Sequence, residues 1–170
     1  MNLRIIFTFS AITALGLALL PGSAVAQQGT LKQLLVGAWT LVSVENTASD
    51  GAKSQPFGAY PKGMLIVDAG GRYAAVYGRS DRPKLKSANR SDLTAQELGT
   101  AALDFNANYA TWSVNEADKT IALHFDYTLI PNTEGADAKA AVSLVGDGLK
   151  LLFTNPVTGV DTDFVFRRAR

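Results

Sequence analysis

The chain has 170 residues, with 16 lysines and arginines against 15 aspartates and glutamates and a formal net charge of +1. This balance gives no overall basic field, so nucleic acid is not an expected partner. The sequence contains one histidine and no cysteine. It therefore predicts no disulfide framework and no metal centre built from imidazoles or thiolates.

Residues 1–26 have the pattern of a signal peptide. Arg4 gives a positive start, residues 5–20 form an uncharged apolar run, and Ala24-Val25-Ala26 supplies the small residues that signal peptidase requires. An uncleaved membrane anchor is the alternative, but the run is short for a span, which needs about 20 residues. We expect a periplasmic or secreted protein, a single mature domain of residues 27–170, and no stable membrane anchor after cleavage.

Eight segments combine β-branched or aromatic residues with flanking turn signals, which is typical of strands. They are residues 37–45, 63–68, 72–79, 108–114, 119–129, 138–145, 149–154 and 160–168. Residues 30–35 are expected to form a short helical lead-in. A Gly-x-Trp at the head of the first strand and a basic residue at the end of the last favour a sheet that closes on itself. Eight strands is the size at which a closed barrel just holds side chains or one small ligand.

One helix is expected between the third and fourth strands. Thr94 and Glu97 have the spacing of a capping box, and Leu98, Ala101 and Phe105 fall on one helical face. The pattern predicts a helix over residues 94–105 that packs on the sheet, either as plain packing or as a lid.

The segment before this helix, residues 79–90, is rich in basic residues. Arg79, Arg82, Lys84, Lys86 and Arg90 stand against a single acid, Asp81. Such a run is typical of a solvated loop. It also fits a basic rim at a barrel mouth that steers a carboxylate or sulfate head group inward.

Side-chain alternation groups the candidate ligand-binding residues. In residues 119–129, Ile121, Leu123, Phe125, Tyr127 and Leu129 share one face, and the period alone does not decide which face points inward. Tyrosines combine an apolar ring with a polar handle, as small-molecule pockets require, although aromatics also fill small barrels. The candidate ligand-binding residues are Tyr73, Tyr77, Arg79, Tyr109, Trp112, His124 and Tyr127.

Catalytic chemistry has little support in the sequence. A Ser-His-Asp triad would have to use His124, with Asp126 two residues on and on the same face. No Gly-x-Ser-x-Gly turn presents a serine, so His124 is only a weak catalytic candidate and a non-catalytic protein is favoured. Gly70-Gly71 is not followed by a helix, so it is a turn and no dinucleotide cofactor is expected.

Several segments, in their order and spacing, resemble the bacterial lipocalin-like domain family. They are Gly37-Ala38-Trp39-Thr40-Leu41-Val42-Ser43, Pro56-Phe57-Gly58, residues 61–65, 68–73, 79–83 and 109–114, Pro131-Asn132 and Arg168. The resemblance spans residues 34–168. It implies an all-β fold: a calycin-like, closed eight-stranded antiparallel barrel with one inserted helix. It also implies that Trp39 lies at the closed end and that Arg168 covers its indole in a cation–π contact.

The leading hypothesis is an exported lipocalin-like protein that binds a small hydrophobic or amphipathic molecule in its barrel. One alternative is an isomerase or cyclase acting on an apolar substrate in the same barrel, with His124, Tyr127 or Tyr109 as proton donor. Another is a filled barrel that serves as an envelope interaction module. The resemblance carries no catalytic residue over to this chain.

Overall fold

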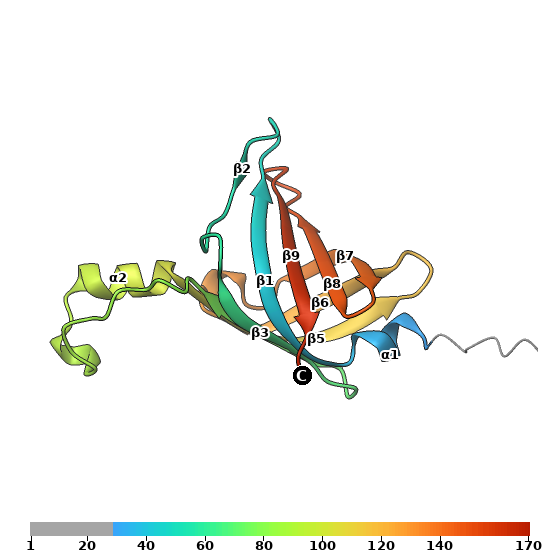
Figure 1. Ribbon diagram of the computed structural model, residues 1–170, viewed down its shortest axis with the longest axis horizontal. Coiled ribbons are helices and arrows are strands. Elements are labelled where there is room, and N and C mark those ends of the chain that lie inside the picture. Colours follow the sequence, from blue (N-terminus) through green and yellow to red (C-terminus); the bar gives the residue numbers. More distant parts are fainter. Residues whose placement is uncertain (1–28) are drawn as a thin grey trace, which may run out of the picture.

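The computed structural model describes residues 29–170, and the predicted signal peptide lies outside this part (Figure 1). Each of the eight predicted strands is present, with ends shifted by a few residues. The elements in chain order are α1 (Leu31–Leu35), β1 (Gly37–Thr47), β2 (Lys53–Ser54), β3 (Lys62–Val67), β4 (Arg72–Gly78), the 3₁₀ turn η1 (Arg90–Asp92), α2 (Ala95–Leu103), β5 (Phe105–Asn115), β6 (Thr120–Thr128), η2 (Pro131–Thr133), β7 (Asp137–Val145), β8 (Gly148–Thr154) and β9 (Asp161–Arg168).

The strands form one antiparallel sheet that closes on itself. Its order is β2-β1-β3-β4-β5-β6-β7-β8-β9, and β1 also pairs with β9, from Trp39 opposite Arg168 to Thr47 opposite Asp161. The closed eight-stranded barrel predicted from the sequence is therefore confirmed, with the two-residue β2 as an addition beside β1. Closure pairs the first and last barrel strands with each other.

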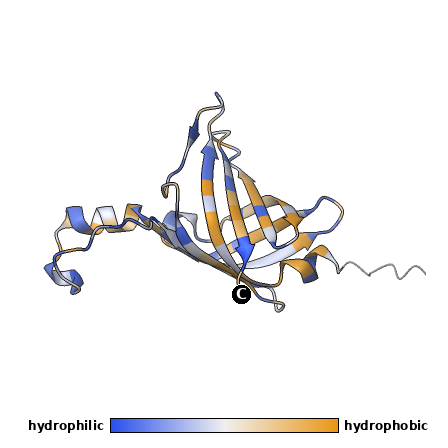
Figure 2. Ribbon diagram, viewed as in Figure 1, coloured by the Kyte–Doolittle hydropathy of each residue, from blue (hydrophilic) through white to orange (hydrophobic). Residues whose placement is uncertain are grey.

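The core is densest at one end of the barrel, which we call the closed end. Leu35, Trp39, Leu65, Ile121 and Leu149 are at most 1% exposed there. The helix α1 lies against this end, with a capping box at its start and its first amides bound to a carboxylate of the β5–β6 turn. Apolar and polar positions alternate along the strands, as Figure 2 shows, because successive side chains point to opposite faces.

The inserted helix does not pack on the sheet as predicted. Its capping box is present, with Thr94 and Glu97 bonded reciprocally, but α2 has no buried residue. Residues 79–104, which we call the arm, project away from the barrel between β4 and β5 (Figure 1). The prediction is wrong because the apolar face of the helix is turned to residues 82–93 of the arm itself.

A β-bulge divides the inward face of β6. Ala110 pairs with Phe125 while Tyr109 pairs with Tyr127, so Asp126 is an extra residue on β6. Leu123 is buried, and its face is the inward one. The prediction that Tyr127 shares this face is wrong, because the extra residue turns Tyr127 outward, where it is 61% exposed.

Candidate functional site

The closed end is built around Trp39. Its indole N–H donates to the Leu35 carbonyl at 2.9 Å, and the guanidinium carbon of Arg168 lies 4.0 Å from the ring centroid. Arg168 also donates to the carbonyls of Val36 and Leu34 at 3.1 and 2.6 Å. The predicted cation–π contact is present, and these bonds tie the last strand to the end of α1.

The opposite end, which we call the mouth, carries inward-facing aromatic rings. Tyr77 meets the edge of Phe164 at a centroid distance of 5.4 Å, and Phe153 meets Phe164 at 5.8 Å. Phe57, from the loop between β2 and β3, stands edge-on to Tyr77 at 5.1 Å. Phe57, Phe153, Phe164 and Phe125 are only partly buried, so the mouth keeps apolar surface in contact with water.

Two asparagines of β5 add polar groups to this aromatic lining. The Asn106 amide donates to the Tyr77 hydroxyl at 2.7 Å. Asn108 Oδ1 is shielded from water and accepts no hydrogen bond from the described residues, which is costly for a buried acceptor. Burial raises the pKa of Tyr77 to about 12, although the Asn106 bond opposes the rise. Burial also raises the pKa of Tyr73, so both phenols stay neutral at physiological pH.

Three of the predicted ligand-binding residues point into the barrel. Tyr73, Tyr77 and Trp112 are all less than 9% exposed. Only Tyr77 belongs to the mouth. Tyr73 and Trp112 lie toward the closed end, where the Trp112 indole donates to the Asp68 carbonyl at 2.9 Å and both side chains contribute to the core.

Three others lie on the outside of the barrel. Tyr109 and Tyr127 stack on each other across β5 and β6, with centroids 6.0 Å apart. His124 is exposed, and its Nδ1 lies 2.8 Å from Asp137 on β7, whereas Asp126 faces Arg72 at 3.8 Å. The His124–Asp126 pairing considered from the sequence is therefore wrong. The three side chains considered as proton donors all face away from the interior.

Arg79 stands where the arm leaves β4. Its guanidinium donates to both carboxylate oxygens of Asp81, at 3.0 and 2.8 Å, and lies 3.7 Å from Asp104. The Asp81 bond raises the pKa of Arg79 and lowers the pKa of Asp81. The charge of Arg79 is thus compensated by acids within the arm.

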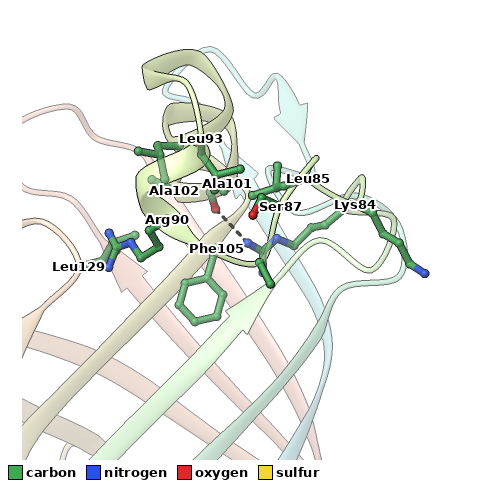
Figure 3. Close-up of a pocket in the computed structure, with 12 residues that line it drawn as sticks. Lys84, Leu85, Ser87, Arg90, Leu93, Ala101, Ala102, Phe105 and Leu129 are labelled. Atoms are coloured by element: carbon green, nitrogen blue, oxygen red, sulfur yellow. Dashed lines mark hydrogen bonds between the residues drawn. The ribbon is translucent and has the colours of Figure 1, made fainter.

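The largest described recess lies under the arm, on the outside of the barrel, and Figure 3 shows its lining. Its volume is about 680 Å³. Its apolar walls include Leu85, Leu93, Leu98, Ala101, Phe105 and Leu129. Arg82 crosses it, with its guanidinium 5.3 Å from the Phe105 ring centroid and a bond to the Ala101 carbonyl at 3.2 Å.

Four residues of the mouth were not among the ligand-binding candidates named from the sequence: Phe57, Phe153, Phe164 and Asn108. Phe153 and Phe164 alternate along their strands with the buried residues Leu151 and Phe166, so the two-residue period of a strand could have predicted that they point inward. Within residues 29–170, no cluster of three or more His, Cys, Asp or Glu side chains could hold a metal ion. In the same range, no helix is long and apolar enough to cross a membrane.

Comparison with known families decides what this barrel is related to. The lipocalin-like domain family matches residues 36–162. The chain belongs to this family. No curated protein matches the chain.

Similar solved structures have low sequence identity to this lipocalin-like protein. A lipocalin-like protein from Bacteroides uniformis has 14% identity and a TM-score of 0.42, over 79% of this chain and 98% of that one. A de novo designed fluorescence-activating β-barrel has 12% identity and a TM-score of 0.43, over 84% and 100%. An uncharacterised protein from Bacteroides eggerthii has 14% identity and a TM-score of 0.39, over 79% and 98%.

Proposed function

We propose that this lipocalin-like protein is exported and binds a small hydrophobic or amphipathic molecule in the mouth half of its barrel. The observation that supports the proposal is the group of inward aromatic rings at the mouth that are not fully buried. Inward side chains at the closed end, such as Trp39 and Ile121, are at most 1% exposed. Inward rings at the mouth, such as Phe125, Phe153 and Phe164, are only partly buried.

A ligand in the mouth would cover the apolar surface that these rings leave exposed. Burying apolar surface of the rings and the ligand together is favourable by about 25 cal/mol per Å². Ala138, opposite Leu123 on the inward face, has a small side chain. The Asn108 oxygen offers an acceptor to a ligand hydroxyl or amide once neighbouring rings give way, which would relieve its unpaired state.

Phe57 is suited to cover such a ligand. It belongs to a loop, its ring rests edge-on against Tyr77, and Gly58 next to it has a φ of +76°, which glycine adopts without strain. Loops are more mobile than the strands that they connect and often carry binding residues.

The binding test uses a neutral naphthylamine dye whose fluorescence rises in apolar surroundings. We expect saturable binding to the protein and at least about tenfold weaker binding to an Ala138→Leu variant, because the added methyl groups occupy the mouth. Ala141→Leu, on the outer face of the same strand, is the matched control. Absence of saturable binding across neutral apolar probes, or equal loss in both variants, contradicts the proposal.

Export is tested separately. The full chain, expressed in a bacterial host with a periplasm, is expected outside the cytoplasm with Gln27 as its first residue, because the Ala24-Val25-Ala26 segment presents the cleavage site. Retention of residues 1–26 on a membrane-bound protein would favour the anchor alternative.

A further inference from the structure

We propose that the recess under the arm is a second site, which binds a single-chain amphipathic anion. In this arrangement the apolar tail lies along Leu93 and Leu98, and the anionic head group meets Arg90 at one side of the recess, while Lys84 adds positive charge at the other side (Figure 3).

The apolar walls of the recess are incompletely covered by the described residues. Leu85, Leu93, Leu98 and Phe105 line it, and all four remain partly exposed, although Arg82 lies over the Phe105 ring. A nine-residue helix is marginal by itself and is normally stabilised by packing its apolar face. The helix α2 keeps its capping box but has no buried residue. A bound tail would supply the missing core of the arm.

The charge around the recess selects the head group. Three basic residues, Arg82, Lys84 and Arg90, line it, and no acidic residue does. Within residues 29–170, no ion pair involves any of these three side chains, whereas Arg79 and Lys86 of the same arm are paired with acids. An apolar recess with uncompensated positive charge at its rim is complementary to a carboxylate or sulfate on an alkyl chain.

The arm recess is distinct from the barrel mouth. Phe105 pairs with Gly78 and precedes Asn106, whose amide reaches the inward Tyr77 hydroxyl. Since neighbouring residues of a strand point to opposite faces, the Phe105 ring lies outside the barrel, and it lines the recess there. The recess volume of about 680 Å³ falls within the roughly 300–1,000 Å³ typical of small-molecule sites.

Occupancy of the recess should change the dynamics of the arm. A tail held by residues on both sides of the recess links α2 to residues 82–93 and to the base of β5. Amide hydrogen exchange in α2 should therefore slow on binding, while exchange in the barrel core stays unchanged.

The test is calorimetric titration of the protein with dodecanoate below its micelle concentration, followed by hydrogen exchange. We expect saturable binding that is at least about tenfold tighter than that of dodecyltrimethylammonium, because only the anion matches the basic rim. Protection is expected in residues 94–104. A double variant, Lys84→Gln with Arg90→Gln, should bind about three- to tenfold more weakly, as expected for exposed charge pairs.

Matched controls separate this site from the barrel mouth. Arg167→Gln with Arg170→Gln removes the same number of charges far from the arm and should leave the affinity unchanged. Ala102→Trp fills the recess and should abolish dodecanoate binding, whereas Ala95→Trp, on the same helix outside the recess, should not. Neither tryptophan should alter binding of the neutral dye, so failure at one site is distinguishable from failure at the other.

Three results would overturn the proposal. Equal affinity for the anionic and cationic surfactants would remove the role of the basic rim. Dodecanoate binding that Ala138→Leu abolishes and Ala102→Trp leaves intact would move the ligand into the barrel. Binding to vesicles of anionic phospholipid without any binding of free dodecanoate would make the arm a membrane contact.

Discussion

Replacement of Arg168 by methionine should destabilise the barrel without affecting ligand binding at the mouth. The guanidinium lies 4.0 Å from the Trp39 ring centroid and donates to the carbonyls of Val36 and Leu34. The Leu34 carbonyl belongs to the last turn of α1, where helix carbonyls lack intrahelical partners and favour a cation. Methionine keeps the aliphatic packing over the indole but removes the charge and both donors.

The size of this effect follows from the separate contacts. A hydrogen bond from a charged group contributes roughly 1.5–3 kcal/mol when partly buried, and a cation–π contact contributes about 0.5–2 kcal/mol. The bond to Leu34 is exposed, so water replaces much of it. We expect the free energy of unfolding to fall by about 2–4 kcal/mol, since such contributions are not fully additive.

Urea denaturation measures this loss, with Arg167→Met as the control because its side chain is exposed on the same strand. Arg168→Lys should fall between the two, because it keeps the charge but loses the planar pair of donors. A loss below about 0.5 kcal/mol, or an equal loss in the control, would refute the assigned role. The neutral dye should bind Arg168→Met normally, because its site lies at the other end of the barrel.

Four further predictions concern the mouth and the arm. Burial raises the pKa of Tyr77 from 10.0 to about 12. The neutral phenol therefore contributes its full stability below pH 10.0, and this contribution is lost as the pH rises toward 12. Tyr77→Phe should raise the pH of alkaline unfolding, which circular dichroism measures. Thr94→Ala should speed amide exchange in α2, since loss of a cap costs about 1 kcal/mol, and leave the barrel amides unchanged. Hydrogen bonds from Thr94 lower the pKa of Glu97, so the protection of the α2 amides, relative to the intrinsic exchange rate at each pH, should fall in the unmutated protein as the pH drops below the ordinary value of 4.5. Gly78→Ala should lower the free energy of unfolding by roughly 1–3 kcal/mol, because its Cβ would strike the Asp104 carbonyl oxygen; a fully stable variant would contradict the close approach at the base of the arm.

The strands and the barrel closure were predictable because each depends on local pattern. Hairpin turns at glycines and two-residue alternation place the strand segments, and the parity of Phe164, Phe166 and Arg168 brings the last side chain onto the inward face. Trp39 then pairs directly with Arg168 across β1 and β9, so their contact follows from the register. Alternation alone does not determine closure, which was expected from the Gly-x-Trp at the head of the first strand and the basic residue at the end of the last, and which the resemblance to the lipocalin-like family also implied.

The orientation of Tyr127 could not be predicted from alternation. A single extra residue, Asp126, changes the parity of everything after it on β6. The stacked pair of Tyr109 and Tyr127 lies outside the barrel as a result. A bulge is defined by how two strands pair, with two residues of one strand opposite one residue of the other. The sequence of β6 alone does not show this pairing, so it gave no sign of the bulge.

The placement of α2 was mispredicted for a different reason. Helical periodicity shows that Leu98, Ala101 and Phe105 can share a face, but it does not say what covers that face. In the structure Phe105 already belongs to β5, and the helix faces its own arm instead of the sheet. An apolar stripe predicts burial only where a partner surface is available.

The two proposed sites lie on different parts of the molecule, one inside the barrel mouth and one under the arm. The mouth rings Phe125, Phe153 and Phe164 are only partly buried, so substitutions there remove less core packing than substitutions at Trp39, which is fully buried. The arm, whose helix has no buried residue, contributes still less to the barrel core, so its sequence can change with small effect on the free energy of unfolding. We therefore expect that the arm can vary in sequence without unfolding the barrel. The proposed preference of its recess for anionic over cationic amphiphiles should be measurable in variants of Lys84 and Arg90.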